Sequence, residues 1–122
     1  MRYICLVHAD PARLDALTPA EHADLDRRSL AYDRELAEKG QYVLAEAIQE
    51  PGTAVLVRNR QGAISNTDGP YMETKEFMAG FILIEARDLN EAVRIAAGIP
   101  MAEMGTIEVR PVYIIPTPPE LC

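Results

Sequence analysis

The sequence has only two cysteines, and their positions favour neither a disulfide nor a metal site. Cys5 lies inside the first apolar run, and Cys122 is the last residue. A thiol within a strand and a thiol at a chain end are poorly placed to pair, and their spacing matches no zinc-binding pattern. His8, Asp10, His22 and Asp26 offer other metal-ligating groups, but without a recognisable ligand spacing. We therefore expect two free thiols in a reducing compartment and no metal.

Long hydrophobic runs are also missing. No apolar run exceeds six residues, whereas a membrane-spanning helix needs roughly 20. Met1 and Arg2 lead directly into a strand-like segment, without the charged, apolar and cleavage regions of a signal peptide. These absences predict a cytoplasmic protein that does not enter the membrane.

Basic residues are few: 12 Lys and Arg stand against 19 Asp and Glu, which gives a net charge of -7. The basic residues form no cluster, so the chain should repel a nucleic acid backbone and an anionic membrane surface. The sequence also lacks a Gly-rich phosphate loop, a serine-nucleophile elbow and a paired-cysteine motif. We therefore expect no cofactor, and nucleotide-dependent and acyl-transfer chemistry are disfavoured.

The residues that are present predict one domain of alternating strands and helices. Strands are expected at residues 3–7, 41–47, 53–58, 63–66, 80–86 and 106–115. Thr18, Pro19 and Glu21 form a helix start, and that helix should end near Lys39. Asp88 should cap a second helix at 89–97. Residues 1–115 are predicted to form the folded core, and 116–122 a Pro-rich tail.

The order of these elements is β-α-β, an inserted hairpin with its loop at 59–62, and β-α-β. Two such units on one antiparallel sheet, with both helices on one face, form a ferredoxin-like α+β subunit, βαβ(ββ)βαβ. This arrangement leaves the second face of the sheet bare. A second copy of the same sheet is the simplest cover for its apolar residues, so we predict a face-to-face homodimer.

The first predicted helix has an unusual core-facing stripe. At about 100° per residue, three leucines share the stripe with His22, Asp26, Ser29, Tyr32 and Asp33. Hydrogen-bonding groups in such a stripe indicate that part of it borders a cavity. His22 and Asp26 lie one turn apart, so the carboxylate could orient the imidazole, or both could be solvated at the edge of the stripe. His8, at the end of the first strand, is interpreted as a rim residue.

The densest group of charges is the segment Asp68-Gly-Pro-Tyr-Met-Glu-Thr-Lys-Glu76. Asp68 could simply bond backbone N–H groups of its turn, with the later charges forming a solvated run. Alternatively the segment is one wall of a site, because Tyr71 and Phe77 are apolar anchors that would hold it near the sheet. Lys75 would then serve as a charged donor for an anionic or carbonyl-bearing ligand, with Glu73 beside it.

This segment, followed by Gly80-Phe81, resembles the signature of the DGPF proteins of the YCII-related superfamily, with Tyr71 in place of the usual Phe. The likeness extends to Asp88-Leu-Asn-Glu-Ala92 and Glu108-Val-Arg-Pro-Val112. The resemblance implies a ferredoxin-like subunit in a dimeric α+β barrel. DGPF members are mostly uncharacterised, and many are encoded beside extracytoplasmic-function sigma factors.

The wider superfamily is similar to a dehydrochlorinase of chloroaromatic degradation, for which a His–Asp active-site pair has been proposed. Asp68 matches the Asp of that pair. His22 follows a Pro near the helix start, as the superfamily His does, but the helix here is about two turns longer from that point. Ser29 or Tyr32 could occupy the equivalent space instead.

Three functions are consistent with these features. The first is an enzyme for small molecules without a cofactor, using general acid–base chemistry of the elimination or isomerisation type at the sheet–helix junction. In it Asp68 is the base, His22 or Tyr32 the proton partner, and Lys75, Glu73, Ser29 and Asp26 bind the ligand. The second is a non-catalytic ligand-binding or regulatory protein, with a sigma factor as a possible partner. The third is a dimeric scaffold.

Overall fold

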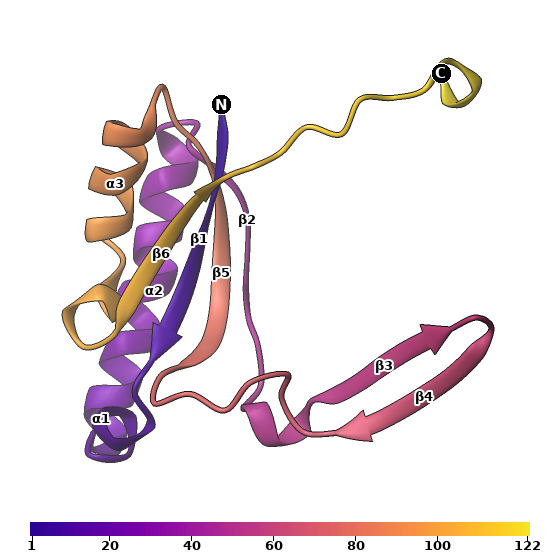
Figure 1. Ribbon diagram of the computed structural model, residues 1–122. Coiled ribbons are helices and arrows are strands. Elements are labelled where there is room, and N and C mark those ends of the chain that lie inside the picture. The colour runs from indigo at the N-terminus through magenta and orange to yellow at the C-terminus, as the bar shows by residue number, and fades with distance from the viewer.

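The computed structural model describes all 122 residues, which form a four-stranded sheet, a separate two-stranded hairpin and three α-helices (Figure 1). The strands are β1 (Arg2–Ala9), β2 (Tyr42–Ala47), β3 (Val55–Arg60), β4 (Ala63–Asp68), β5 (Phe77–Glu85) and β6 (Thr106–Pro111). The α-helices are α1 (Pro11–Asp15), α2 (Pro19–Glu38) and α3 (Leu89–Ala97). Three short 3₁₀ helices follow at Pro51–Thr53 (η1), Pro100–Glu103 (η2) and Pro119–Leu121 (η3).

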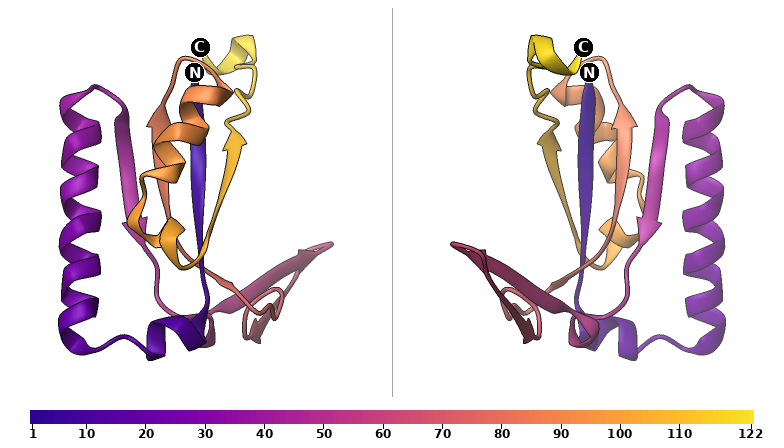
Figure 2. Two further views of the ribbon diagram at one scale, coloured as in Figure 1. Left: turned by 90° about the vertical axis from the view of Figure 1, so that its left-hand side faces the viewer. Right: turned by 90° about the vertical axis from the view of Figure 1, so that its right-hand side faces the viewer.

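The main sheet has the strand order β2-β5-β1-β6, and every neighbouring pair in it is antiparallel. Helices α2 and α3 both lie on one face of this sheet (Figures 1 and 2). This is the predicted ferredoxin-like α+β arrangement, with β3 and β4 as the inserted hairpin. The fold class inferred from the sequence is therefore confirmed.

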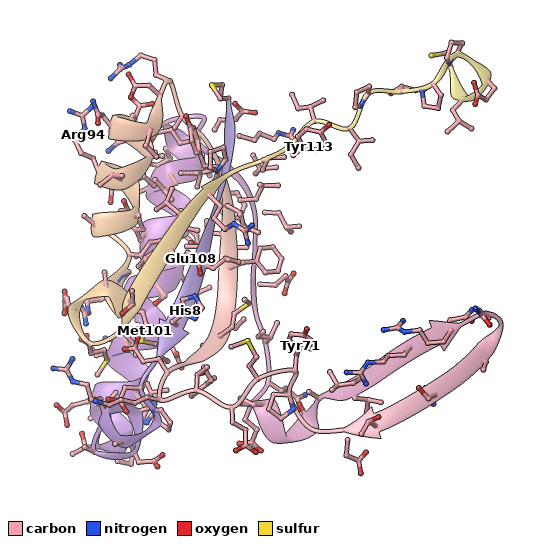
Figure 3. The ribbon with its side chains drawn as sticks, viewed as in Figure 1. His8, Tyr71, Arg94, Met101, Glu108 and Tyr113 are labelled. Carbon is pink, nitrogen blue, oxygen red and sulfur yellow. The ribbon has the colours of Figure 1, made fainter.

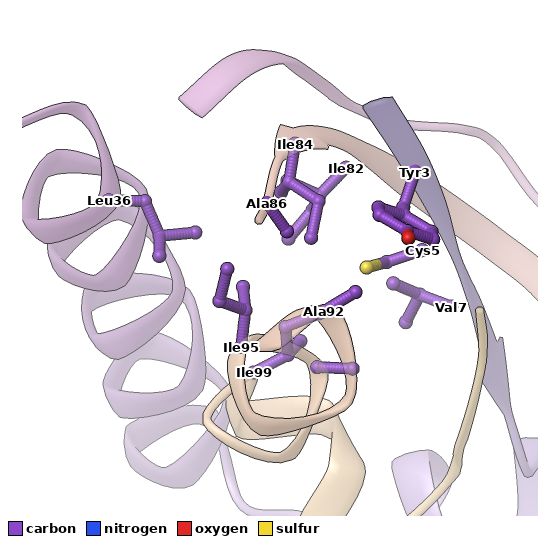
Figure 4. Packing of buried hydrophobic residues seen from close by; sticks show 11 residues of the cluster. Tyr3, Cys5, Val7, Leu36, Ile82, Ile84, Ala86, Ala92, Ile95 and Ile99 are labelled. Atoms are coloured by element: carbon purple, nitrogen blue, oxygen red, sulfur yellow. The ribbon is translucent and has the colours of Figure 1, made fainter. Parts of the chain in front are cut away.

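The alternation of side chains along the strands places the core between the sheet and the helices. In β1, Tyr3, Cys5 and Val7 are buried, while the residues between them are only half-buried. They join the buried residues of β5, α2 and α3 in one cluster (Figure 4). Burial of a large apolar side chain contributes about 1.5–3 kcal/mol, so this single layer holds the fold together.

Cys5 belongs to this core. It is fully buried, and burial raises the pKa of its thiol to about 11. The side chain therefore stays protonated and packs as a small apolar group. Cys122 is exposed, and both cysteines are free thiols, as predicted.

Helix α2 begins where the sequence indicates. Thr18 and Glu21 form a complete capping box, with Glu21 N–H donating to Thr18 Oγ1 (3.2 Å) and Thr18 N–H donating to the Glu21 carboxylate (3.0 Å). These hydrogen bonds lower the pKa of Glu21. Gly40 follows the helix at a φ of 71°, a conformation that glycine adopts without strain.

One short helix was not predicted, and two sets of strand bounds were wrong. Asp10 and Pro11 follow the end of β1 and start the short helix α1, which the Asp10 carboxylate caps by accepting from Ala12 N–H (3.0 Å). The hairpin turn is only Gln61–Gly62, both with positive φ, so β3 lies two residues later than expected and β4 is two residues longer. The last strand ends at Pro111 and not at residue 115, because its pairing with the start of β1 is complete at Val112, whose N–H bonds to Arg2.

The hairpin and the C-terminal segment project from opposite ends of the sheet, toward the side that no helix covers (Figure 1). Both present exposed apolar residues, among them Val57 and Ile64 on the hairpin and Tyr113 and Ile114 beyond β6. The isolated chain thus leaves apolar surface without a partner. None of its helices has the length and apolarity required to cross a bilayer.

The packing of β2 on β5 gives a test of the fold. A Cβ atom at Gly80 would lie 2.7 Å from the Glu46 carbonyl oxygen and 3.1 Å from Ala47 Cα, both backbone atoms that cannot move aside. Gly80→Ala should therefore lower the free energy of unfolding by about 1–3 kcal/mol, measured by urea denaturation. Gly52→Ala is the matched control, because nothing lies within 4 Å of its added Cβ. Equal stability of the two variants would contradict the close approach of the strands.

Candidate functional site

Two of the surface cavities of the chain contain candidate site residues. The first, which we call the loop cavity, has a volume of about 1390 Å³ and lies between the segment 70–78, the turn 48–54 and the adjacent ends of β1 and β6. The second, the helix cavity, measures about 620 Å³ and lies between α2 and the sheet. Chemical groups that can transfer protons are present in both.

The loop cavity contains a histidine paired with a carboxylate. His8 Nε2 lies 3.0 Å from Glu108 Oε1, and the His8 side chain is 24% exposed (Figure 3). The strand register explains the contact: His8 lies opposite Thr106 and Leu6 opposite Glu108, so His8 and Glu108 are diagonal neighbours on the bare face. The carboxylate fixes which ring nitrogen faces it and thereby orients the imidazole.

Hydrogen bonds hold the charged segment beside β6, the strand that carries Glu108. Thr106 Oγ1 donates to Glu76 Oε1 (2.8 Å), and the Thr74 hydroxyl donates to the Glu76 carbonyl. This side-chain bond from β6 holds the segment near the strand that carries Glu108. Lys75, next to Glu76, lines the same cavity and forms no ion pair.

Two other charged groups of the loop cavity, Asp10 and Arg13, are engaged by the backbone, whereas the Glu50 carboxylate forms no hydrogen bond or ion pair. Asp10 caps α1, and Arg13 Nη1 donates to the Met104 carbonyl (3.1 Å). Lys75 therefore remains as a free cation, and Tyr71 and Phe77 supply apolar surface. The arrangement can hold an anionic or carbonyl oxygen on Lys75 while His8 exchanges a proton.

The helix cavity is lined by the polar residues of the α2 stripe, beside a mainly apolar wall. His22 Nε2 lies 3.0 Å from the Leu14 carbonyl oxygen and makes no hydrogen bond with Asp26. Of the two alternatives for this pair, orientation of His22 by Asp26 is not formed in the structure. The backbone carbonyl holds the ring instead.

Tyr32 also lines the helix cavity, and its hydroxyl is occupied. It donates to the Ile95 carbonyl (2.6 Å), and burial, with smaller effects of Glu35 and Cys5, raises its pKa. Burial likewise raises the pKa of Asp33 on the same helix. A tyrosine that keeps its proton and donates it to the backbone is suited to fixing α2 on α3.

The structure does not bring the predicted site residues together. His22, Asp26, Ser29 and Tyr32 line the helix cavity, Lys75 lines the loop cavity, and Asp68 and Glu73 line neither. Asp68 ends β4, and its carboxylate accepts no hydrogen bond; the turn is closed by Gly69 N–H, which donates to the Ala54 carbonyl (2.9 Å). The expected staple by the Asp68 side chain is thus not formed.

The sequence reasoning missed the pair of His8 and Glu108. His8 stands between two buried residues of β1 and Glu108 between two half-buried residues of β6, positions that the period-two pattern assigns to the bare face. A signal was therefore available, once β1 and β6 were known to be adjacent. His8 was interpreted only as a rim residue because that adjacency was not applied.

Comparisons with known proteins agree with this fold. The profile of the YCII-related domain matches residues 1–116. An uncharacterised protein of Rhizobium meliloti (strain 1021) is 31% identical over 116 residues, which cover 93% of this chain and 94% of that protein.

Among solved structures, the fold is similar to that of a 5-chloro-2-hydroxyhydroquinone dehydrochlorinase from Burkholderia phenoliruptrix AC1100, determined as a complex with 2,5-dihydroxybenzoquinone. The TM-score is 0.57 at 16% identity, covering 93% of this chain and 94% of the other. At this identity the likeness shows a common fold.

The bond from Thr106 to Glu76 gives a test of how the segment 70–78 is held. Thr106→Val removes the hydroxyl at nearly constant volume, so hydrogen exchange of residues 70–77 should accelerate on the order of fivefold, as expected for loss of about 1 kcal/mol. Mass spectrometry of the corresponding peptides measures the rate. Thr67→Val is the control, because the Thr67 hydroxyl on β4 makes no hydrogen bond. Unchanged exchange in the Thr106 variant would show that the segment is held by other contacts.

Proposed function

The chain belongs to the YCII-related family, and we propose that it is a small-molecule enzyme that uses general acid–base catalysis in the loop cavity without a dissociable cofactor. One observation carries this proposal: His8 and Glu108 form a 3.0 Å pair in a cavity that is also lined by Lys75, whose ammonium group forms no ion pair. A held imidazole beside an unpaired cation is the minimal set for moving a proton and stabilising the negative charge that results.

The chemistry follows from the orientation of the ring. Neutral His8 donates its Nε2 proton to Glu108, which leaves the lone pair on Nδ1 as the base. Nδ1 takes a proton from a carbon next to a carbonyl group, and the C–H electron pair passes into an enolate whose oxygen is held by Lys75. Expulsion of a leaving group with its electron pair completes an elimination. Return of the proton to a different carbon completes an isomerisation.

The similarity to the dehydrochlorinase supports an elimination. That enzyme is a dehydrochlorinase of 5-chloro-2-hydroxyhydroquinone, and its structure is a complex with 2,5-dihydroxybenzoquinone. The loop cavity of this chain offers Lys75 for an anionic oxygen and Tyr71 and Phe77 for a ring. Oxygenated rings with an acidic C–H bond or a leaving group are therefore the substrate class to test first.

The protein acts as a homodimer in the cytoplasm under this proposal. The bare face of the sheet and the exposed residues of the hairpin and tail support a dimer, because an isolated chain leaves them in water. The two free thiols support a reducing compartment.

The helix cavity favours an alternative function, the binding of a small ligand without catalysis. Its volume of about 620 Å³ is typical of pockets for small ligands, and its His22 and Tyr32 are bound to backbone carbonyls rather than free for catalysis. In this alternative the chain is a non-catalytic ligand-binding or regulatory protein, and its acidic surface suits a basic protein partner such as a sigma factor.

The proposed elimination activity can be tested by measuring chloride release from 5-chloro-2-hydroxyhydroquinone. Variants of the two histidines then show which of the two cavities catalyses the reaction. His8→Asn should lower kcat by about 10²–10⁴-fold with an unchanged urea midpoint, whereas His22→Asn, the same change in the helix cavity, should retain activity. Loss of turnover in the His22 variant alone would transfer the chemistry to the helix cavity. Absence of turnover in the unaltered protein would reject this substrate.

Ligand affinity tests the role of Lys75. Lys75→Met should weaken binding of 2,5-dihydroxybenzoquinone by roughly tenfold, because a charge-assisted contact is lost; isothermal titration measures the change. Lys39→Met is the control. It removes an exposed cation at the end of α2 that pairs with Glu35 and does not line the loop cavity, so binding should be unaltered. Equal effects of both variants would indicate general electrostatic attraction instead of a site.

A further inference from the structure

The bare face of the sheet has an ordered pattern of charge. Cross-strand pairing forms two neighbouring rows, and the first contains Glu46, Phe81, Leu6 and Glu108 in order across β2, β5, β1 and β6. The second row contains Leu44, Leu83, Ile4 and Arg110 in the same order. Each row thus has two apolar residues in its centre, and the charges lie on the outer strands.

These outer charges are unsatisfied within one chain. Glu46 and Arg110 form no hydrogen bond or ion pair, and Glu108 contacts only His8, through one of its two carboxylate oxygens. Other charged residues of the same sheet are paired, since Arg2 Nε bonds Glu85 at 3.0 Å. The four central residues are half-buried at best and would be desolvated by a covering surface.

A second copy can cover this face with its twofold axis in one of two directions. An axis along the strands keeps each row at its own height and exchanges the edges, so Glu108 would face Glu46 of the partner subunit, a repulsive contact. An axis across the strands, placed midway between the two rows, exchanges the rows at the same edge, so Glu108 would face the partner subunit's Arg110, and Arg110 the partner's Glu108. The second direction forms two attractive pairs around the apolar centre.

We propose that a second copy covers the bare face with its axis across the strands, so that the partner's Arg110 binds Glu108 and completes the loop cavity. The role of Arg110 in the candidate site rests on the proposed function, whereas the contact between Arg110 and Glu108 of the two copies does not. The volume supports it: the loop cavity of one chain, about 1390 Å³, exceeds the 300–1,000 Å³ typical of ligand pockets, and a facing copy would narrow it.

Contact with the partner subunit's Arg110 would also hold the pair of His8 and Glu108 in place. With Oε1 toward His8, the second carboxylate oxygen is available to the guanidinium of the partner subunit's Arg110. The carboxylate is then held from both sides, and the imidazole is fixed more firmly. Arg110 is a positioning residue: it acts on the site through Glu108 and from the other copy.

Charge reversal in the full-length chain tests the contact without a ligand. E108R alone and R110E alone should each weaken the dimer on the order of tenfold or more, measured by sedimentation equilibrium. An equal mixture of the two variants should form heterodimers of near-normal affinity, because both contacts between copies become Arg–Glu pairs. Within each variant chain the side chains at positions 108 and 110 have the same charge, both in the separate variants and in the mixture. Any recovery of affinity in the mixture therefore comes from the contact between copies.

E46R is the matched control, since it makes the same charge change at the other end of the row, on β2. A mixture of E46R and R110E should form no preferred heterodimer. Tighter dimerisation of E108R alone, heterodimers of the control mixture, or a monomeric unaltered chain would each overturn the proposal. Circular dichroism of the separate variants identifies any loss of folding, and E108Q and R110Q then replace the reversals, with a smaller expected weakening.

The positioning role has its own readout. The chain has two histidines, so imidazole nitrogen resonances can be assigned simply. At concentrations where R110Q is still dimeric, the resonances of His8 should shift and those of His22 should not. Unchanged His8 resonances would remove Arg110 from the site and leave it as an interface residue. Neither measurement requires turnover, so failure of the enzymatic proposal would be recognised separately.

Discussion

The sheet is covered by helices on one face only, and the rest of the structure depends on this. Strand side chains alternate between faces, so half of each strand joins the core with α2 and α3, and the other half faces outward. The covered half supplies the apolar burial that stabilises the chain. The uncovered half is where charged and titratable residues can stand beside apolar ones without being enclosed, and His8 and Glu108 lie there.

The candidate site arises at one end of that uncovered face, where three separate parts of the chain meet. His8 lies near the end of β1, Thr106 and Glu108 lie near the start of β6, and the segment before β5 contains Lys75 and Glu76. Antiparallel pairing places the end of β1 beside the start of β6, and the bond from Thr106 to Glu76 fastens the third part. On α2, backbone carbonyls hold the His22 ring and the Tyr32 hydroxyl, whereas Asp26, Ser29 and Asp33 form no side-chain hydrogen bond. The two cavities therefore differ in their chemistry: the loop cavity combines a His–Glu pair with an unpaired cation, and the histidine of the helix cavity is held by the backbone.

Much of the fold could be predicted from local patterns. The capping box at Thr18 and Glu21, the glycine after α2 and the alternation in β1 and β5 follow from interactions within a few residues. The site could be predicted only in part. The segment with Lys75 was recognised by its charge density, but Asp68 was assigned to the site although it ends a hairpin strand and lines neither cavity. His8 and Glu108 are separated by 100 residues, and their contact depends on strand order and register.

The sequence by itself determined the order of the main strands and helices, which face of each is apolar, and that one sheet face would lack a cover. Those properties depend on backbone conformation and burial, which each segment expresses through its own spacing of side chains. Only the tertiary structure decided which charged groups are free and which are engaged. A carboxylate or an imidazole has many possible partners along a chain, and the one it meets is chosen by the register of strands and the path of loops. For this reason the pair of His8 and Glu108 emerged from the packing of β1 on β6, and no local motif indicated it.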